Sequence, residues 1–257
     1  MKLSPEFPAR EKESEELFAK PDLNYQQKWL EKMDFLESVS SEHNAVVALF
    51  DCSQYRFIYF CDKSNVLGGY DPALFTAENG MDFTFSNVHP DHRSAAILIQ
   101  LKVFSFGMEH ASLQSNSIIA NSTFLYKKKN GEYIQYLHKG LVVEKDDAGN
   151  PLLYLRYGYD ISHLMKPSVG LIINCPEGIL IWNYNIKTKN LEQINLLSPQ
   201  EKKILHLLSE GRESKEIADM LFVSSHTIDT HRRNLLKKTN CIDTTALITF
   251  SKMTGLI

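Results

Sequence analysis

The C-terminal part of the chain carries start and stop signals for short helices, and these constrain its fold more than any other feature. In LSPQEKKILHLLSEG, Ser198 can cap the free amide groups at a helix start, Pro199 suits the first helical position, and Glu201 completes a capping box. Gly211 is placed to end this helix, because glycine tolerates the left-handed backbone found there. A second short helix is predicted from Ser214.

Two more helices are predicted after tight turns. Val223-Ser224 turns the chain, and Ser224 can cap a third helix that runs to about Thr239. Asp243 or Thr244 can cap a fourth helix, which ends near Gly255. The apolar positions of the first two helices recur at helical spacing and should form a small core: Ile204, Leu205, Leu207, Leu208, Ile217, Ala218 and Leu221.

This pattern resembles the LuxR-type (GerE-type) helix-turn-helix over residues 197–247. The matching residues are Leu197, Ser198, Glu201, Gly211, Lys215-Glu216-Ile217-Ala218, Leu221, Val223-Ser224, Thr227-Ile228, His231, Asn234-Leu235 and Lys238. The sequence departs from the family at Gln200 (usually Arg), Asp229 (usually Lys) and Thr239-Asn240-Cys241 (usually Leu-Gly-Val). The resemblance implies an all-α four-helix domain that binds double-stranded DNA. It also implies a dimer surface on the fourth helix at Leu247, Ile248 and Met253, although these residues could instead only close the small core.

The third predicted helix has one face for the core and one for DNA. At about 100° per residue, Ile228, His231 and Leu235 point in similar directions, toward the core. The opposite face could be an ordinary solvated charged surface, but the resemblance favours contact with DNA. The predicted DNA-binding residues are Lys215, Ser224, Ser225, His226, Thr227, Asp229, Thr230, Arg232, Arg233, Lys237 and Lys238.

These residues are expected to divide between reading bases and holding phosphates. Arg233 can donate bidentately to a guanine, which contributes ~1–3 kcal/mol of base discrimination. Phosphate contacts, which set affinity rather than sequence, are expected from Arg232, Lys237, Lys238 and the helix start at Ser224, Ser225 and Thr227. One such module offers too few phosphate contacts for tight binding at cellular salt, so a homodimer on a paired site is expected.

Asp229 is an acid on the surface that should face DNA. It lies one turn before Arg233, so the two could pair at i,i+4 and hold the guanidinium in place. Alternatively, its carboxylate could accept a hydrogen bond from a cytosine amino group. Either role would trade affinity for orientation or specificity.

Strand-like runs dominate the region before residue 166. Ala45–Asp51 and Arg56–Phe60 are β-branched and aromatic, and three later strands are separated by turn signals at Asn130-Gly131 and Asp146–Pro151. The first of these strands ends in FLYKKK, the second covers Glu132–Val143, and the third is LLYLRYGYDIS.

Helices are predicted on both sides of the first strand pair. An amphipathic helix is predicted over Tyr25–Val39, with Trp29, Met33, Leu36 and Val39 on its apolar side. A long helix is predicted over about Arg93–Ala111, with one apolar face formed by Ile97, Leu101, Phe104 and Met108.

This order of elements, together with several short sequence motifs, resembles the PAS family over about residues 29–165. The motifs are Gly69-Tyr70, His89-Pro90-Asp91-His92, Asn130-Gly131-Glu132 and Asp160-Ile161-Ser162. The predicted fold class is α+β: a PAS-like antiparallel-sheet domain followed by an all-α four-helix domain. The predicted units are an N-terminal arm (1–28), a PAS-like sensory or interaction domain (29–165), a β-hairpin connector (166–196) that extends the sheet or forms a contact surface, and the DNA-binding domain (197–257).

Composition limits the remaining possibilities. The net charge is −3, divided into +2 over residues 198–257 and −5 over the rest, which favours the C-terminal part for DNA. Cys52, Cys61, Cys175 and Cys241 are expected to be thiols in a reducing cytoplasm, with no metal site. The charged N-terminus and the lack of a long apolar run predict a cytoplasmic protein with no membrane contact.

Catalysis and cofactors are not predicted. The His89–His92 segment is expected to be a structural turn, and no phosphate loop or nucleophile motif is present. The aromatic residues Phe50, Phe57, Tyr59 and Phe60 are expected to be core rather than a cofactor box, and the ligand of the PAS-like domain stays open.

Two functional hypotheses follow. The first is a sequence-specific transcription regulator, not an enzyme, whose PAS-like domain senses a small molecule or protein or mediates dimerisation, with RNA polymerase as a possible partner. The second is an interaction protein whose PAS-like domain binds another protein, with DNA contact secondary.

Overall fold

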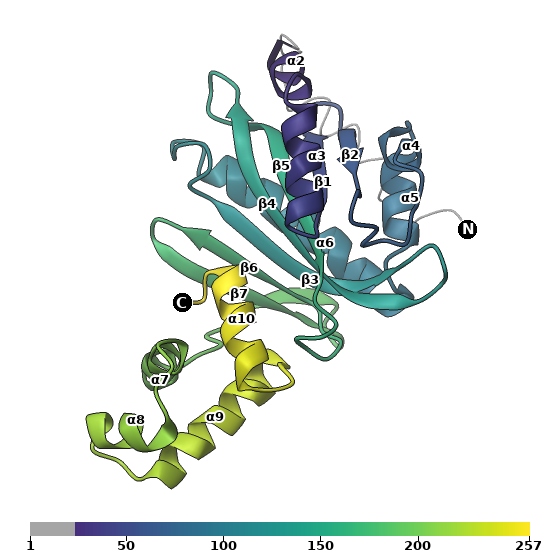
Figure 1. Ribbon diagram of the computed structural model, residues 1–257. Coiled ribbons are helices and arrows are strands. Elements are labelled where there is room, and N and C mark those ends of the chain that lie inside the picture. The colour runs from purple at the N-terminus through teal and green to yellow at the C-terminus, as the bar shows by residue number, and fades with distance from the viewer. Residues whose placement is uncertain (1–23) are drawn as a thin grey trace.

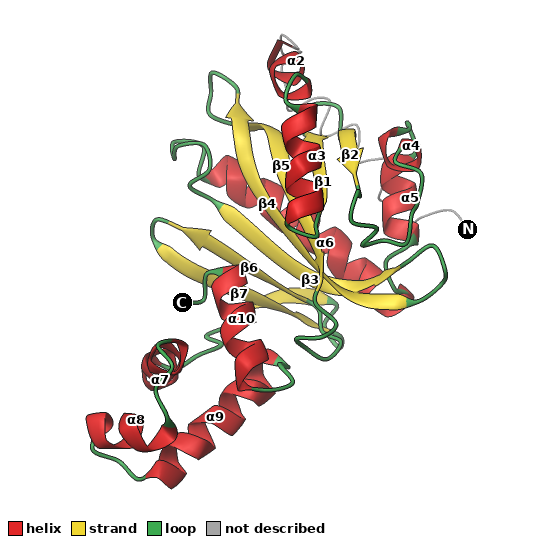
Figure 2. Cartoon of the chain, viewed as in Figure 1, coloured by secondary structure: helices red, strands yellow, loops and turns green. Residues whose placement is uncertain are grey.

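The computed structural model describes residues 24–257, so most of the arm expected over residues 1–28 lies outside the described residues. An antiparallel sheet and its covering helices come first, and four helices follow at the C-terminus (Figures 1 and 2). The predicted α+β fold class is confirmed.

The sheet follows the element order expected from the PAS resemblance. The five strands that the sequence predicted are β1 (Val46–Asp51), β2 (Arg56–Cys61), β3 (Ile119–Lys127), β4 (Tyr133–Lys145) and β5 (Pro151–Asp160). They are arranged in the order β2-β1-β5-β4-β3, and all pairs are antiparallel. The β3–β4 turn uses Gly131 at φ 91°, a backbone angle that glycine adopts without steric cost.

The connector after β5 continues the same sheet. It forms β6 (Gly170–Cys175), β7 (Gly178–Asn185) and β8 (Asn190–Gln193), and β6 pairs with β3 from Thr123↔Gly170 to Ile119↔Asn174. Of the two roles left open for this segment, the structure therefore shows extension of the sheet.

The single helix predicted over Tyr25–Val39 is wrong, because the chain forms α2 (Asn24–Leu30) and α3 (Met33–Glu42). Long-range contacts interrupt it. The Trp29 indole donates to Glu144 on β4 at 2.8 Å, and the Tyr25 hydroxyl donates to Asp51 at the end of β1 at 2.6 Å. Of the predicted apolar side, Leu36 is buried, whereas Met33 is 45% exposed.

Helices α4 (Ala73–Thr76), α5 (Gly80–Ser86) and α6 (Pro90–Glu109) cover one face of the sheet (Figure 1). The predicted apolar face of α6 is displaced: its buried residues are Ala95, Ala96, Ile99, Gln100, Phe106 and Gly107, while Ile97, Leu101, Phe104 and Met108 are only half-buried. Small side chains on α6 allow this helix to pack closely against the sheet. A Cβ on Gly107 would lie 2.8 Å from Pro151 Cγ and 2.9 Å from the Tyr154 hydroxyl, so glycine lets α6 approach β5 closely.

The C-terminal helices are α7 (Pro199–Ser209), α8 (Ser214–Leu221), α9 (Ser225–Thr239) and α10 (Thr244–Thr254). The predicted caps form: Ser198 and Glu201 make a capping box, Ser224 accepts from Thr227 N, and Asp243 accepts from Ala246 N. Asn240, at the position where the LuxR pattern has glycine, adopts φ 58°, a left-handed conformation that asparagine tolerates.

The helical domain packs against the sheet through α10 and the α9–α10 turn. Backbone bonds join Lys166 N to Asn240 O (2.9 Å) and Ile242 N to Leu164 O (3.0 Å). One apolar cluster combines sheet-domain residues with buried residues of the helices, including Leu137, Ile161, Leu164, Met165, Ile172, Leu205, Leu247, Phe250 and Leu256. The two parts therefore share a core.

Leu247→Ala tests this shared core. Leu247 is fully buried, and removing a buried leucine side chain costs ~2–5 kcal/mol because a cavity remains. Urea unfolding should show this loss in the free energy of unfolding. The control Ile186→Ala, at a side chain that is 79% exposed, should change it by less than ~0.5 kcal/mol. Equal effects of the two substitutions would contradict the packing.

Candidate nucleic-acid interface and a buried cavity

Helix α9 extends away from the sheet, and its outer side is open to solvent (Figure 1). Ile228 and Leu235 are fully buried on its inner side, as the helical geometry predicted, and His231 is half-buried. Of the predicted DNA-binding residues, Thr227, Asp229, Thr230 and Arg232 are half-buried, and the others are exposed: Lys215, Ser224, Ser225, His226, Arg233, Lys237 and Lys238. All of these residues lie on α8, on α9 or in the turn between them.

The start of α9 has the geometry of an anion-binding helix end. The Ser224 hydroxyl accepts from Thr227 N at 3.1 Å and lies 2.9 Å from the Thr227 hydroxyl. The amides of the next two residues, Ser225 and His226, belong to the first helical turn, where no preceding turn supplies an acceptor. Ser224, Ser225 and His226 are exposed, so a phosphate can approach these N–H groups and the positive end of the helix dipole.

Asp229 does not orient Arg233. Its Oδ1 accepts a hydrogen bond from the Ser214 hydroxyl at 2.8 Å and lies 3.9 Å from Arg232 Nη1. Arg232 Nη1 also donates to Ser214 at 2.8 Å, and its Nη2 donates to Thr244 at 3.0 Å. This network joins the first residues of α8 and α10 to the middle of α9. The acid therefore helps fix the angle of α9 inside the domain.

Arg233 is held within its own helix. Its Nη2 donates to the Thr230 hydroxyl at 2.9 Å, and the side chain is exposed. The i,i+4 pair expected with Asp229 is replaced by this i,i+3 contact. The rest of the guanidinium remains available for a base edge.

Lys238 forms an ion pair inside the domain. Its Nζ lies 2.7 Å from Glu201 Oε2, and Glu201 also accepts from Ser198 N in the capping box. Burial alone raises the pKa of Glu201, but hydrogen bonds from Lys238 and Ser198 outweigh it, so the pKa is lowered. Phosphate contacts by Lys238 and Arg232 stay predictions, since both side chains already stabilise the helical domain.

The apolar residues of α10 are packed within this single chain. Leu247 is fully buried, and the half-buried Ile248 and Met253 pack against the shared core. This is the arrangement of the alternative in which the three residues close the small core. The exposed positions of α10 are the polar Thr245, Thr249 and Lys252.

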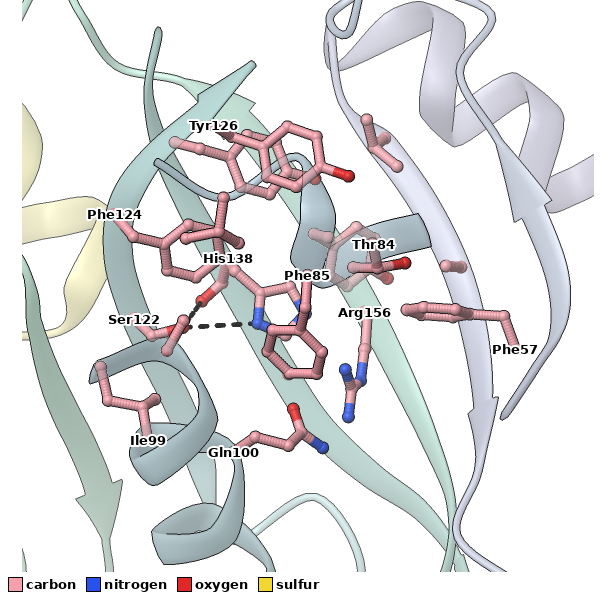
Figure 3. Close-up of a pocket in the computed structure, with 18 of the residues that line it drawn as sticks. Phe57, Thr84, Phe85, Ile99, Gln100, Ser122, Phe124, Tyr126, His138 and Arg156 are labelled. Atoms are coloured by element: carbon pink, nitrogen blue, oxygen red, sulfur yellow. Dashed lines mark hydrogen bonds between the residues drawn. The ribbon is translucent and has the colours of Figure 1, made fainter. Parts of the chain in front are cut away.

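A cavity of about 70 Å³ lies between the sheet and helices α5 and α6 (Figure 3). Much of its lining is apolar, including Phe57 and Phe60 of the aromatic group that the sequence assigned to the core. Tyr59, from the same strand, points to the opposite face and packs near Leu36. The polar lining includes Gln100, Ser122, His138 and Arg156, which were not predicted as site residues.

His138 is held in its neutral form beside this cavity. Its Nδ1 lies 3.4 Å from the Ser122 hydroxyl. Burial, and secondarily the positive charge of Arg156, lower its pKa to about 3. Among the described residues that line the cavity, Arg156 is therefore the permanent cation.

The His89–His92 turn has structural roles. His89 caps α6 by accepting from Asp91 N at 3.2 Å, and His92 Nδ1 accepts from Leu125 N at 3.0 Å. Within residues 24–257, no cluster of three metal-ligating side chains forms, and the four cysteines are free thiols. In the same range, no helix is both long and apolar enough to span a membrane.

Comparison with known proteins identifies the helical domain. Residues 195–251 match "Bacterial regulatory proteins, luxR family". The transcriptional regulatory protein MctR of Rhizobium johnstonii is 43% identical over 61 residues, which are 24% of this chain and 28% of that protein. The virulence factors putative positive transcription regulator BvgA of Bordetella pertussis is 38% identical over 63 residues, which are 24% of this chain and 30% of that protein. The C-terminal domain is thus a LuxR-type helix-turn-helix, as the sequence resemblance indicated.

These relatives match this chain over less than a third of their own length. The sheet domain is similar to a solved structure, the N-terminal domain of a diguanylate cyclase with a PAS/PAC sensor from Marinobacter aquaeolei. That match covers 46% of this chain and 96% of the other at 16% identity, with a TM-score of 0.37. The likeness of the sheet domain to PAS domains rests on the strand and helix order described above.

The lowered pKa of His138 predicts acid sensitivity. A histidine whose folded-state pKa lies below its unfolded value of about 6.5 contributes stability that is complete above that value and is lost as the pH falls toward about 3. The urea midpoint should therefore decrease between pH 6.5 and 4. His138→Gln, which cannot titrate, should reduce this pH dependence, whereas the control His226→Gln, at an exposed residue, should not. Identical pH profiles for wild type and His138→Gln would contradict the assignment.

Proposed function

We propose that this chain is a sequence-specific DNA-binding transcription regulator with no catalytic role, in which the PAS-like sheet domain senses a signal or mediates dimerisation. The observation that carries the proposal is the open outer side of α9 within a LuxR-type domain. A cytoplasmic location and contact with RNA polymerase belong to the same proposal.

Base reading is assigned to Arg233, and phosphate contacts to groups around it. Arg233 is exposed on the middle of α9, where a helix in the major groove presents its side chains to base edges. Lys237 lies one turn further along the same side, and Lys215 projects from the start of α8. Together with the free amides at Ser225 and His226, these cations supply the charge that neutralises phosphates.

A homodimer on a paired site is the proposed form that binds DNA. A few phosphate contacts in one module give weak binding, because each neutralised phosphate contributes a slope of only about 0.9 in log affinity against log salt. Two modules related by two-fold symmetry double the contacts and place their half-sites about 10 base pairs apart.

A second candidate function is protein interaction through the sheet domain. The observation that favours it is the exposure of two large apolar side chains on α3, Phe35 at 64% and Met33 at 45%. In this alternative, DNA contact is secondary, and loss of Arg233 leaves the main activity unchanged.

Arg233→Ala tests the main proposal in a gel shift. The DNA is a set of random genomic fragments, together with those fragments that the wild-type chain enriches by binding. Because one bidentate arginine–guanine contact contributes ~1–3 kcal/mol, the substitution should weaken binding to the enriched sites by about 10- to 100-fold. The control Lys187→Ala removes an exposed charge on the turn between β7 and β8 and should leave binding unchanged. Binding that is independent of salt and unaffected by Arg233→Ala would rule the proposal out.

A further inference from the structure

Arg156 is a buried cation at the centre of the sheet domain. It lies on β5, is only 5% exposed, and points into the cavity between the sheet and α6 (Figure 3). Burial lowers its pKa to about 10, so the guanidinium remains protonated near neutral pH. Burying such a charge is costly unless a partner compensates it.

No acceptor compensates this charge among the described residues. The guanidinium forms no hydrogen bond or ion pair there, and its Nε is fully buried without a partner. Aromatic rings lie near it, with Phe50 at 4.1 Å, Phe57 at 5.5 Å and Tyr154 at 5.7 Å from the guanidinium carbon. Ring faces attract the positive charge but do not satisfy N–H donors that point along the guanidinium plane.

The neighbouring unpartnered groups are also donors. Gln100 is more than nine-tenths buried, and its amide nitrogen has no hydrogen-bond partner among the described residues. The buried Tyr154 hydroxyl has no partner within residues 24–257, and burial raises its pKa, so it keeps its proton. Figure 3 shows Gln100 and Arg156 directed into the same space beside Phe57. Arg156 Nε, Gln100 Nε2 and the Tyr154 O–H are therefore donors without an acceptor among the described residues.

We propose that the cavity binds a small organic monocarboxylate, whose carboxylate pairs with Arg156 and whose short apolar part packs among the aromatic and aliphatic side chains. A carboxylate is purely an acceptor, and its two oxygens fit the planar fork of an arginine. The proposal deepens the sensing role proposed above, and its biological meaning rests on that role.

The size and charge of the cavity narrow the ligand class. At about 70 Å³ it is smaller than the 150 Å³ cavity that holds benzene, so acids of roughly two to four carbon atoms fit without rearrangement. Because His138 is neutral, Arg156 is the one cation among the described lining residues. A dicarboxylate or a phosphate dianion would therefore leave an uncompensated negative charge. Apolar residues such as Ile99, Val103 and Phe85 favour an alkyl group over a hydrated inorganic anion.

The test is a calorimetric titration of the full chain with propionate, butyrate and lactate, and with propionamide and chloride as matched controls. Saturable binding of at least one acid with one site per chain is expected, with propionamide and chloride at least about 10-fold weaker. Removing a hydrogen-bonded charge weakens binding by about 10- to 100-fold, which is the loss expected for Arg156→Met. Arg56→Met is the control, because Arg56 lies on β2 and does not line the cavity.

Thermal unfolding without ligand adds a second readout. If the charge of Arg156 is compensated only by a bound ligand, the Arg156→Met variant should melt at the same or a higher temperature than the wild type, because an uncompensated buried charge is removed. If the arginine serves only to stack on the aromatic rings, the same substitution should lower the melting temperature, and that result would overturn the proposal.

Three other results would also overturn it: no binding of any acid to the wild type, equal binding of propionamide and propionate, or equal acid binding by wild type and Arg156→Met. The acid and amide comparison uses the wild-type chain, so it decides the question whether or not the variant folds. No DNA is present in these titrations. Acid binding without any DNA binding in the gel shift would therefore remove the proposed function and leave the carboxylate site standing.

Discussion

Strands β3 and β4 contact the cavity with one face and the helical domain with the other, and the rest of the structure depends on this arrangement. Successive side chains of a strand point to opposite faces, so Ser122 and His138 line the cavity while their neighbours Asn121 and Lys139 face the helical domain. Asn121 donates to Thr254 O at 3.3 Å, and Lys139 donates to Met253 O at 3.1 Å, both at the C-terminal end of α10. The same strands therefore support the cavity and the helical domain.

This arrangement gives a short physical route between the cavity and the DNA-binding surface. Helix α10 is held at its end by the sheet, and at its start Thr244 accepts from Arg232 of α9. Arg232 and Asp229 share the Ser214 hydroxyl at the start of α8. The orientation of α9 is thus set by side chains that connect to the sheet through one helix, α10. Asp229, which the sequence places on a DNA-facing side, therefore belongs to the hydrogen-bond network that positions the basic residues of α9.

The features that the sequence predicted correctly depend on local signals. Caps at Ser198, Ser224 and Asp243 act within one helical turn, and the strand and turn sequences are short runs of characteristic composition. The errors came from contacts between distant residues. Trp29 and Tyr25 bind strand ends, and one predicted helix is two helices in the structure. Gly107 allows α6 to pack closely on β5, which changes the buried face of this helix. Asp229 accepts a hydrogen bond from Ser214 instead of pairing with Arg233. Arg156 was missed because β5 is covered on both faces, so its sequence shows no alternation that marks an inward charge.

Selection of bound sites from a random duplex library by the full chain tests whether the outer side of α9 reads DNA sequence. We expect enrichment of a motif with two related half-sites, centred about 10 base pairs apart and each containing a guanine contacted by Arg233. A library that retains its random composition after repeated rounds, while the chain remains folded, would contradict it.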